Sequence, residues 1–94
     1  MPYIKKENRP QLDEHIEKLA EVIKKLSAEQ DGDTGFAGLL DYSCTRLALK
    51  VIPTRRYWVI ALITGVFKNI ADEFYRRYGV PYEDEQIKKN GDVY

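Results

Sequence analysis

The spacing of large apolar side chains in the second half of the chain constrains the fold more than any other feature. They recur in steps of three and four residues, at Ile60, Ile63, Phe67, Ile70 and Phe74. Such steps place side chains on one face of a helix with 3.6 residues per turn. The spacing predicts a helix over about residues 56–78, ended by a cap at Gly79 with Pro81 just beyond it.

Two earlier segments follow the same rule. The first stripe consists of Leu12, Ile16, Leu19, Ile23 and Leu26, and the second of Phe36, Leu40, Ser43, Cys44, Leu47 and Val51. They predict helices over about 9–28 and 36–52, and Pro53 ends the second one. Because no segment shows the alternation of a strand, we expect an all-α fold. It is predicted to be a small three-helix bundle forming one domain over residues 1–94.

The last 14 residues, PYEDEQIKKNGDVY, predict a short additional helix over about 81–89. Pro81 suits a first helical position, acids follow it at the positive helix end, and lysines occupy the negative end. Asn90-Gly91 is a stop signal. A helix this short is marginal alone, so we expect it to pack back onto the bundle. The available anchors are Tyr82, Ile87, Val93 and Tyr94.

Composition excludes several classes of protein. Lys plus Arg and Asp plus Glu number 15 each, so the chain lacks the basic excess of a general nucleic-acid binder. A single cysteine excludes an internal disulfide and indicates a reducing compartment. The N-terminus has no apolar signal core, and the longest apolar run is about half the ~20 residues of a membrane span. The expected location is therefore the cytoplasm, with no membrane association.

Catalytic and metal-binding patterns are incomplete. Cys44 lies on an apolar stripe, where a buried thiol behaves as a small hydrophobe, and His15 is the only histidine. In the loop 29–35, Asp31-Gly-Asp33 lacks the calcium-loop spacing and predicts a capping turn. We therefore predict no catalytic residue, metal or cofactor. A magnesium-dependent nucleotide hydrolase remains an alternative, and its candidate ligands are Glu14, Glu17, Asp72 and Glu73.

Basic and aromatic residues supply the candidate binding surface. Residues 46–71 contain five basic side chains and no acidic one, and the stretch FYRRYGVPY (74–82) combines arginines with aromatic residues. Tyrosine and arginine are enriched where proteins dock, whereas arginine beside an aromatic ring also suits nucleic acid or phosphate. The candidate binding residues are Tyr42, Arg46, Arg55, Arg56, Arg76, Arg77, Tyr82, Glu83 and Asp84.

Apolar residues away from the main stripes indicate a homodimer, because a monomer would leave them uncovered. These residues are Tyr42, Leu49, Trp58 and Leu62. The preferred function is a non-enzymatic interaction and oligomerisation module with an unidentified protein partner. Binding of nucleic acid or a nucleotide phosphate through the arginine–tyrosine surface is the first alternative, and the hydrolase is the second.

The chain also resembles a family of short, functionally uncharacterised microbial proteins. The resemblance rests on the start Met1 to Ile4, the segment Gly38 to Leu47, the Glu73 to Arg77 run and the end Pro81 to Tyr94. Asp41, Lys68 and Leu39 depart from the family pattern, where Asn, Glu and an acidic helix cap are usual. The resemblance implies an all-helical protein of this length and carries no reaction with it.

Overall fold

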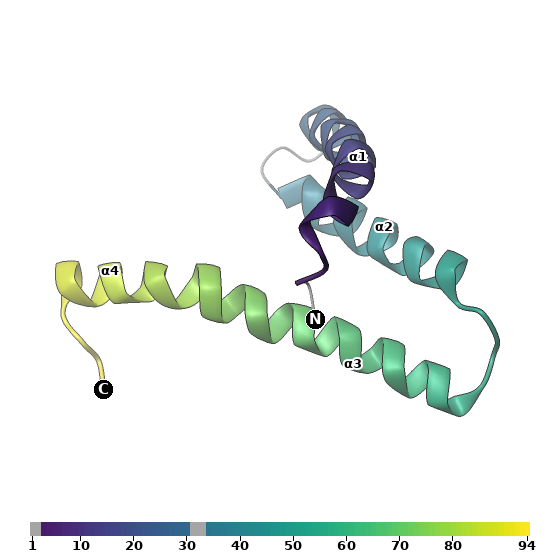
Figure 1. Cartoon of the computed structure of the whole chain (residues 1–94). Coiled ribbons are helices and arrows are strands. Elements are labelled where there is room, and N and C mark those ends of the chain that lie inside the picture. The colour runs from purple at the N-terminus through teal and green to yellow at the C-terminus, as the bar shows by residue number, and fades with distance from the viewer. Residues whose placement is uncertain (1–2, 31–33) are drawn as a thin grey trace. The chain divides into compact units, whose positions relative to one another are not determined.

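The structure is a computed structural model that describes residues 3–30 and 34–94, and all its regular elements are helical (Figure 1). The all-α class predicted from the sequence is therefore confirmed. The described residues form two compact units, one over residues 3–55 and one over residues 56–94. The predicted turn at Asp31–Asp33 lies outside the described residues. No helix in the described part of the chain has the length and apolar character needed to cross a membrane.

The first unit is a helical hairpin. A short 3-10 turn, η1 (Lys6–Asn8), leads into α1 (Arg9–Glu29), and α2 (Gly35–Val51) follows. Arg9 begins α1 and ties the preceding segment to it, because its Nε and Nη2 atoms donate hydrogen bonds of 3.2 and 3.0 Å to the carbonyl of Ile4. Pro10 is tolerated in the first turn, where its missing N–H has no intrahelical partner. Ile52 adopts an extended conformation before Pro53, which ends α2 as predicted.

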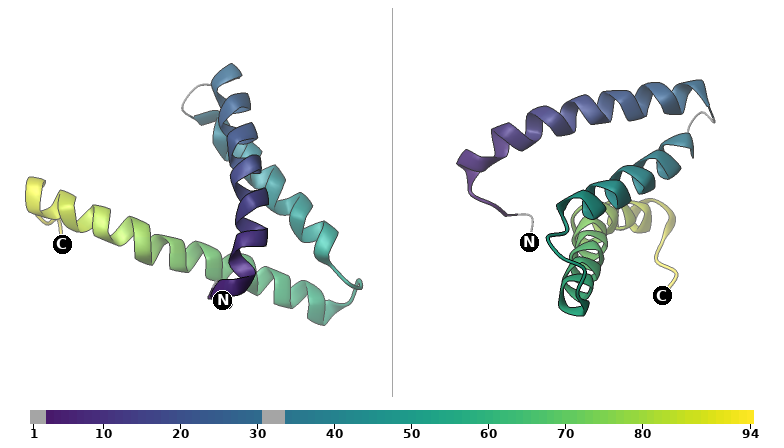
Figure 2. Two further views of the ribbon diagram at one scale, coloured as in Figure 1. Left: turned by 45° about the horizontal axis from the view of Figure 1, so that its top comes forward. Right: turned by 90° about the vertical axis from the view of Figure 1, so that its right-hand side faces the viewer.

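The two hairpin helices converge towards the end where they are connected (Figure 2). Ser27 of α1 is buried there, and a Cβ atom added to Gly35 of α2 would lie 3.2 Å from the Ser27 hydroxyl oxygen. Further along, the predicted α1 stripe stays open, since Leu12, Ile16 and Leu19 are all exposed. The hairpin therefore holds a close contact at its corner and leaves much of its apolar surface uncovered.

The second unit is one long helix rather than two. α3 (Tyr57–Phe74) passes through a π-helical turn, η3 (Tyr75–Gly79), directly into α4 (Val80–Asn90), as one uninterrupted ribbon (Figure 1). The prediction that Gly79 caps a separate helix is wrong, because Gly79 has helical angles of φ −76° and ψ −48°. The predicted C-terminal helix exists, but it is joined to its predecessor.

The π turn explains how the long helix accommodates Pro81. Inside a regular α-helix, a proline ring clashes with the carbonyl four residues earlier, here that of Arg77. In η3 the Val80 N–H instead donates to the carbonyl of Tyr75, five residues back, so the turn is wider. The extra residue in this turn relieves the clash before Pro81 is reached. The helix then ends at Gly91, whose φ of +91° suits glycine and whose N–H donates to the Ile87 carbonyl at 2.8 Å.

Packing of the tail onto the helical hairpin stays a prediction, because the predicted anchor residues are exposed within their own unit. Val93 and Tyr94 are almost fully exposed, and Tyr82 and Ile87 are exposed on α4. The helical part of the tail continues a helix that is already formed, so it needs no new nucleus.

Candidate functional site: the exposed face of the long helix

The long helix carries a continuous row of large apolar side chains, which we call the long-helix stripe. It consists of Ile60, Ile63, Phe67, Ile70, Phe74, Tyr78 and Tyr82. All of them except Ile63 are exposed. A helix that is apolar along one face is ordinarily covered on that face by another element. Within its own unit the long helix has no second helix to cover it.

The π turn extends the long-helix stripe into α4. Its members are three and four residues apart as far as Phe74, and four apart from Phe74 to Tyr82. Steps of four would drift around a regular α-helix, but the wider π turn holds more residues and keeps them in line. The Phe74 and Tyr78 rings accordingly stack, with centroids 5.2 Å apart and an interplanar angle of 19°. The turn therefore aligns the aromatic end of the stripe.

A second contact crosses the same turn. The Tyr75 phenol donates a hydrogen bond of 2.5 Å to Glu83 Oε1, eight residues later. The Tyr75 ring lies over Gly79, where an added Cβ would be only 2.8 Å from its Cδ2 atom. The hydrogen bond to the Glu83 side chain is the main cause that raises the pKa of Tyr75 above its ordinary 10.0. Glycine at position 79 thus allows a side-chain bridge along the helix.

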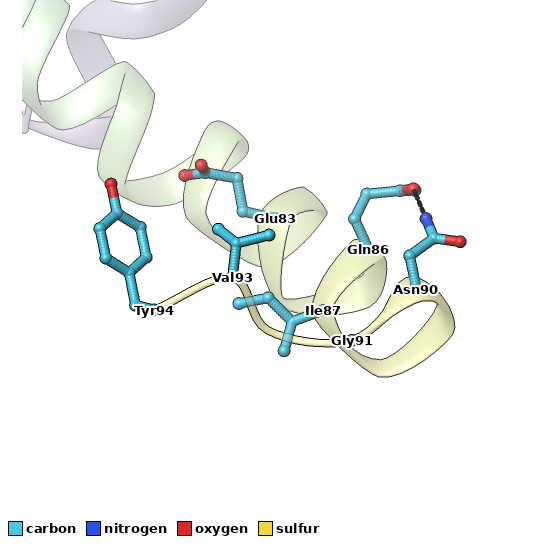
Figure 3. Close-up of a pocket in the computed structure, with 7 residues that line it drawn as sticks. All are labelled: Glu83, Gln86, Ile87, Asn90, Gly91, Val93 and Tyr94. Atoms are coloured by element: carbon cyan, nitrogen blue, oxygen red, sulfur yellow. Dashed lines mark hydrogen bonds between the residues drawn. The ribbon is translucent and has the colours of Figure 1, made fainter.

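The chain end forms a shallow hollow against α4 (Figure 3). Its volume is about 290 Å³, and its lining is mostly apolar; the lining residues are Glu83, Gln86, Ile87, Asn90, Gly91, Val93 and Tyr94. Asn90 Nδ2 donates to Gln86 Oε1 at 3.2 Å, and the Tyr94 N–H donates to Asp92 Oδ1 at 2.9 Å. The one charged side chain among these described lining residues, Glu83, is exposed.

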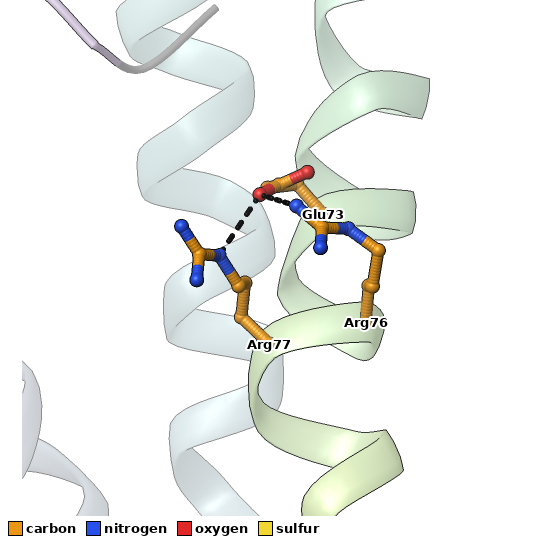
Figure 4. Close-up of polar contacts among 3 residues, drawn as sticks. All are labelled: Glu73, Arg76 and Arg77. Atoms are coloured by element: carbon orange, nitrogen blue, oxygen red, sulfur yellow. Dashed lines mark hydrogen bonds and ion pairs between the residues drawn. The ribbon is translucent and has the colours of Figure 1, made fainter.

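The two arginines of η3 share one carboxylate (Figure 4). Arg76 Nη2 and Arg77 Nε lie 2.6 and 3.2 Å from Glu73 Oε1. Glu73 is half-buried, whereas both arginine side chains are largely exposed. Part of the predicted arginine–tyrosine surface is therefore neutralised by an acid of the same helix, which weakens its attraction for phosphate.

The remaining predicted binding residues are distributed over both units. Tyr42 and Arg46 lie exposed on α2, Arg55 precedes the long helix, and Arg56 is its N-terminal capping residue. Tyr82 and Asp84 are exposed on α4, where Asp84 has Glu83 beside it. Sequence reasoning missed the bridge from Tyr75 to Glu83. Tyr75, Gly79 and Glu83 are spaced four residues apart. This spacing predicts a contact between Tyr75 and Glu83 only when the turn between them is known to be a π turn.

The residues considered for nucleophilic catalysis are Cys44 and His15. Cys44 is a half-buried free thiol on α2, and His15 is exposed on α1. Among residues 3–30 and 34–94, no three His, Cys, Asp or Glu side chains come together to hold a metal ion.

These features define a small all-α protein with a long, apolar-faced C-terminal helix. The chain belongs to the family described as Domain of unknown function (DUF6899), which matches residues 1–93. The resemblance to an uncharacterised family of short helical proteins is thereby confirmed. No curated protein and no solved structure matches the chain.

Proposed function

We propose that this protein is a non-enzymatic interaction module that binds another protein through the long-helix stripe. The observation that carries the proposal is the exposure of that stripe, in which Ile70, Phe74, Tyr78 and Tyr82 each expose more than half of their surface. Isolated aromatic residues on a surface are ordinary, but a contiguous apolar face marks an interaction site.

The residue types in the stripe fit docking better than catalysis. Tyrosine and phenylalanine are enriched in the cores of protein interfaces because they bury large areas with few rotatable bonds. The Glu73–Arg76–Arg77 cluster lies beside the aromatic end and supplies a polar rim. The bridge from Tyr75 to Glu83 and the stacking of Phe74 on Tyr78 hold the helix in one geometry before any partner arrives.

Site-specific photo-crosslinking in cells that express the full chain tests this function. A photoreactive phenylalanine analogue at position 74 should form adducts with a protein, which mass spectrometry then identifies by its peptides. The same analogue at Leu49 is the matched control, because Leu49 has a similar exposed fraction (57% against 62% for Phe74) but lies on α2. Adducts from position 74 and few from position 49 support the proposal. If position 74 forms no protein adduct, the stripe is not an interaction surface.

A further inference from the structure

The length of the long-helix stripe limits what can cover it. The 18, 5 and 11 residues of α3, η3 and α4 form a helix of about 50 Å at 1.5 Å per residue. α2 has 17 residues, or about 25 Å, and only a short connection separates it from α3. Folded back along the long helix, α2 would end near Phe74 and leave Tyr78 and Tyr82 uncovered. By length, α1 (21 residues, about 31 Å) nearly spans the roughly 33 Å from Ile60 to Tyr82, whereas a second copy of the long helix spans all of it.

Charges at the two ends of the stripe set the direction of that copy. Arg55 and Arg56 precede its first residue, whereas Glu83, Asp84 and Glu85 directly follow its last one. All five side chains are exposed. Two parallel copies would place arginines beside arginines and acids beside acids. Two antiparallel copies place each arginine pair beside the acids of the other copy, and they also oppose the helix dipoles favourably.

We infer that the partner of this surface is a second copy of the chain, packed antiparallel along the long-helix stripe. The inference rests on the proposed function and names its partner. A twofold axis near Ala71, the midpoint of the stripe, brings Ile60 against Tyr82 of the partner subunit. It also brings Arg55 and Arg56 beside Asp84 and Glu85 of the partner subunit. The interface is then an apolar row closed at both ends by opposite charges.

Charge reversal with sedimentation analysis tests the inference. The first variant is R55E/R56E, the second is D84K/E85K, and the third combines all four changes. Glu83 is kept because it holds Tyr75. The control K24E/K25E makes the same change in net charge as the first variant, on exposed positions of α1. Circular dichroism of each variant verifies that its helices have formed.

The wild-type chain should sediment at twice its 11.0 kDa mass. Each two-residue reversal should raise the dimer dissociation constant by about tenfold or more, and the combined variant should recover most of that loss. The control should stay close to wild type. A combined variant that is weaker than both parents indicates parallel pairing and overturns the inference. A wild-type chain that stays monomeric also overturns it, while adducts of position 74 with a different protein would leave the proposed function intact.

Discussion

The Tyr75 phenol reaches Glu83 along the surface of one helix, across eight residues and a π turn, and donates a hydrogen bond of 2.5 Å to its carboxylate. The ring passes over Gly79, where an added Cβ would lie 2.8 Å from its Cδ2 atom. Pro81 makes the wide turn favourable, and the wide turn keeps side chains spaced by four residues in line. A proline, a glycine and a tyrosine therefore determine together how the aromatic end of the helix is presented.

The bridge predicts a late tyrosine ionisation. The neutral phenol is the donor, so the contact raises the pKa of Tyr75 above 10.0, its ordinary value and the value expected in the unfolded chain. The hydrogen bond from Tyr75 to Glu83 stabilises the folded chain fully below pH 10.0, and this contribution is lost as the pH rises through the raised pKa of Tyr75. In an absorbance titration of tyrosinate, Y75F should remove the most alkaline step, and E83Q should move that step to lower pH. A titration in which Y75F removes an ordinary step would contradict the bridge.

Replacing Gly79 by alanine should break the bridge without breaking the helix. The new Cβ would lie 2.8 Å from the Tyr75 ring, which must rotate away from Glu83. The matched control is G65A on α3, where an added Cβ meets nothing within 4 Å. G65A should gain about 0.5–1 kcal/mol in the free energy of unfolding from helix propensity alone. G79A should gain less and should return the Tyr75 pKa towards its ordinary value; equal gains and an unchanged titration would show that the ring does not depend on Gly79.

Replacing Pro81 by alanine should convert the π turn into regular α-helix. The restored N–H can donate four residues back, and the steric reason for the wider turn disappears. We expect the free energy of unfolding, measured in urea at fixed protein concentration, to rise by about 1–3 kcal/mol. The pKa of Tyr75 should fall at the same time, because Glu83 rotates out of line. A more stable P81A variant that keeps the late tyrosine step would show that Pro81 does not cause the turn.

The corner of the hairpin predicts opposite effects at two glycines of α2. An alanine Cβ at position 35 would press on Ser27, with its hydroxyl oxygen at 3.2 Å and its backbone oxygen at 3.3 Å. We expect G35A to lower the free energy of unfolding by about 1–2 kcal/mol, since overpacking a tight contact costs that much. G38A, whose Cβ meets nothing within 4 Å, should raise it by about 0.5–1 kcal/mol. Urea denaturation of both variants checks the pair, and a stabilised G35A would mean that the corner is not tight.

The helices of this chain follow from local rules, which is why the sequence predicts them well. Steps of three and four between apolar residues, Pro53 after α2 and Gly91 after α4 act within a few residues of where they stand. The predicted start of α1 and the ends of α2 and α4 agree with the structure within a residue. The stop at Asn90-Gly91 is confirmed by the positive φ of Gly91.

The joined helix could not be predicted in the same way, because Gly79 and Pro81 together form a strong stop signal. Both residues remain helical because the turn before Pro81 widens into a π turn. The bridge from Tyr75 to Glu83 depends on that turn, and so does the alignment of Tyr78 and Tyr82 with Phe74. The candidate arginines were identifiable by type, and Glu73 lies three and four residues before Arg76 and Arg77, the helical spacings at which such ion pairs form.

Distances between spin labels at two positions of the long helix test the central claim most directly. Cys44 is replaced by serine, and single cysteines at Lys68 or Lys89 carry the label. In an antiparallel pair centred near Ala71, the two labels at position 68 should lie about 10–20 Å apart and those at position 89 about 50 Å apart, given 1.5 Å per residue and helix axes 8–10 Å apart. Short distances at both positions would contradict the antiparallel arrangement, and the absence of any interchain distance would contradict self-association through this helix.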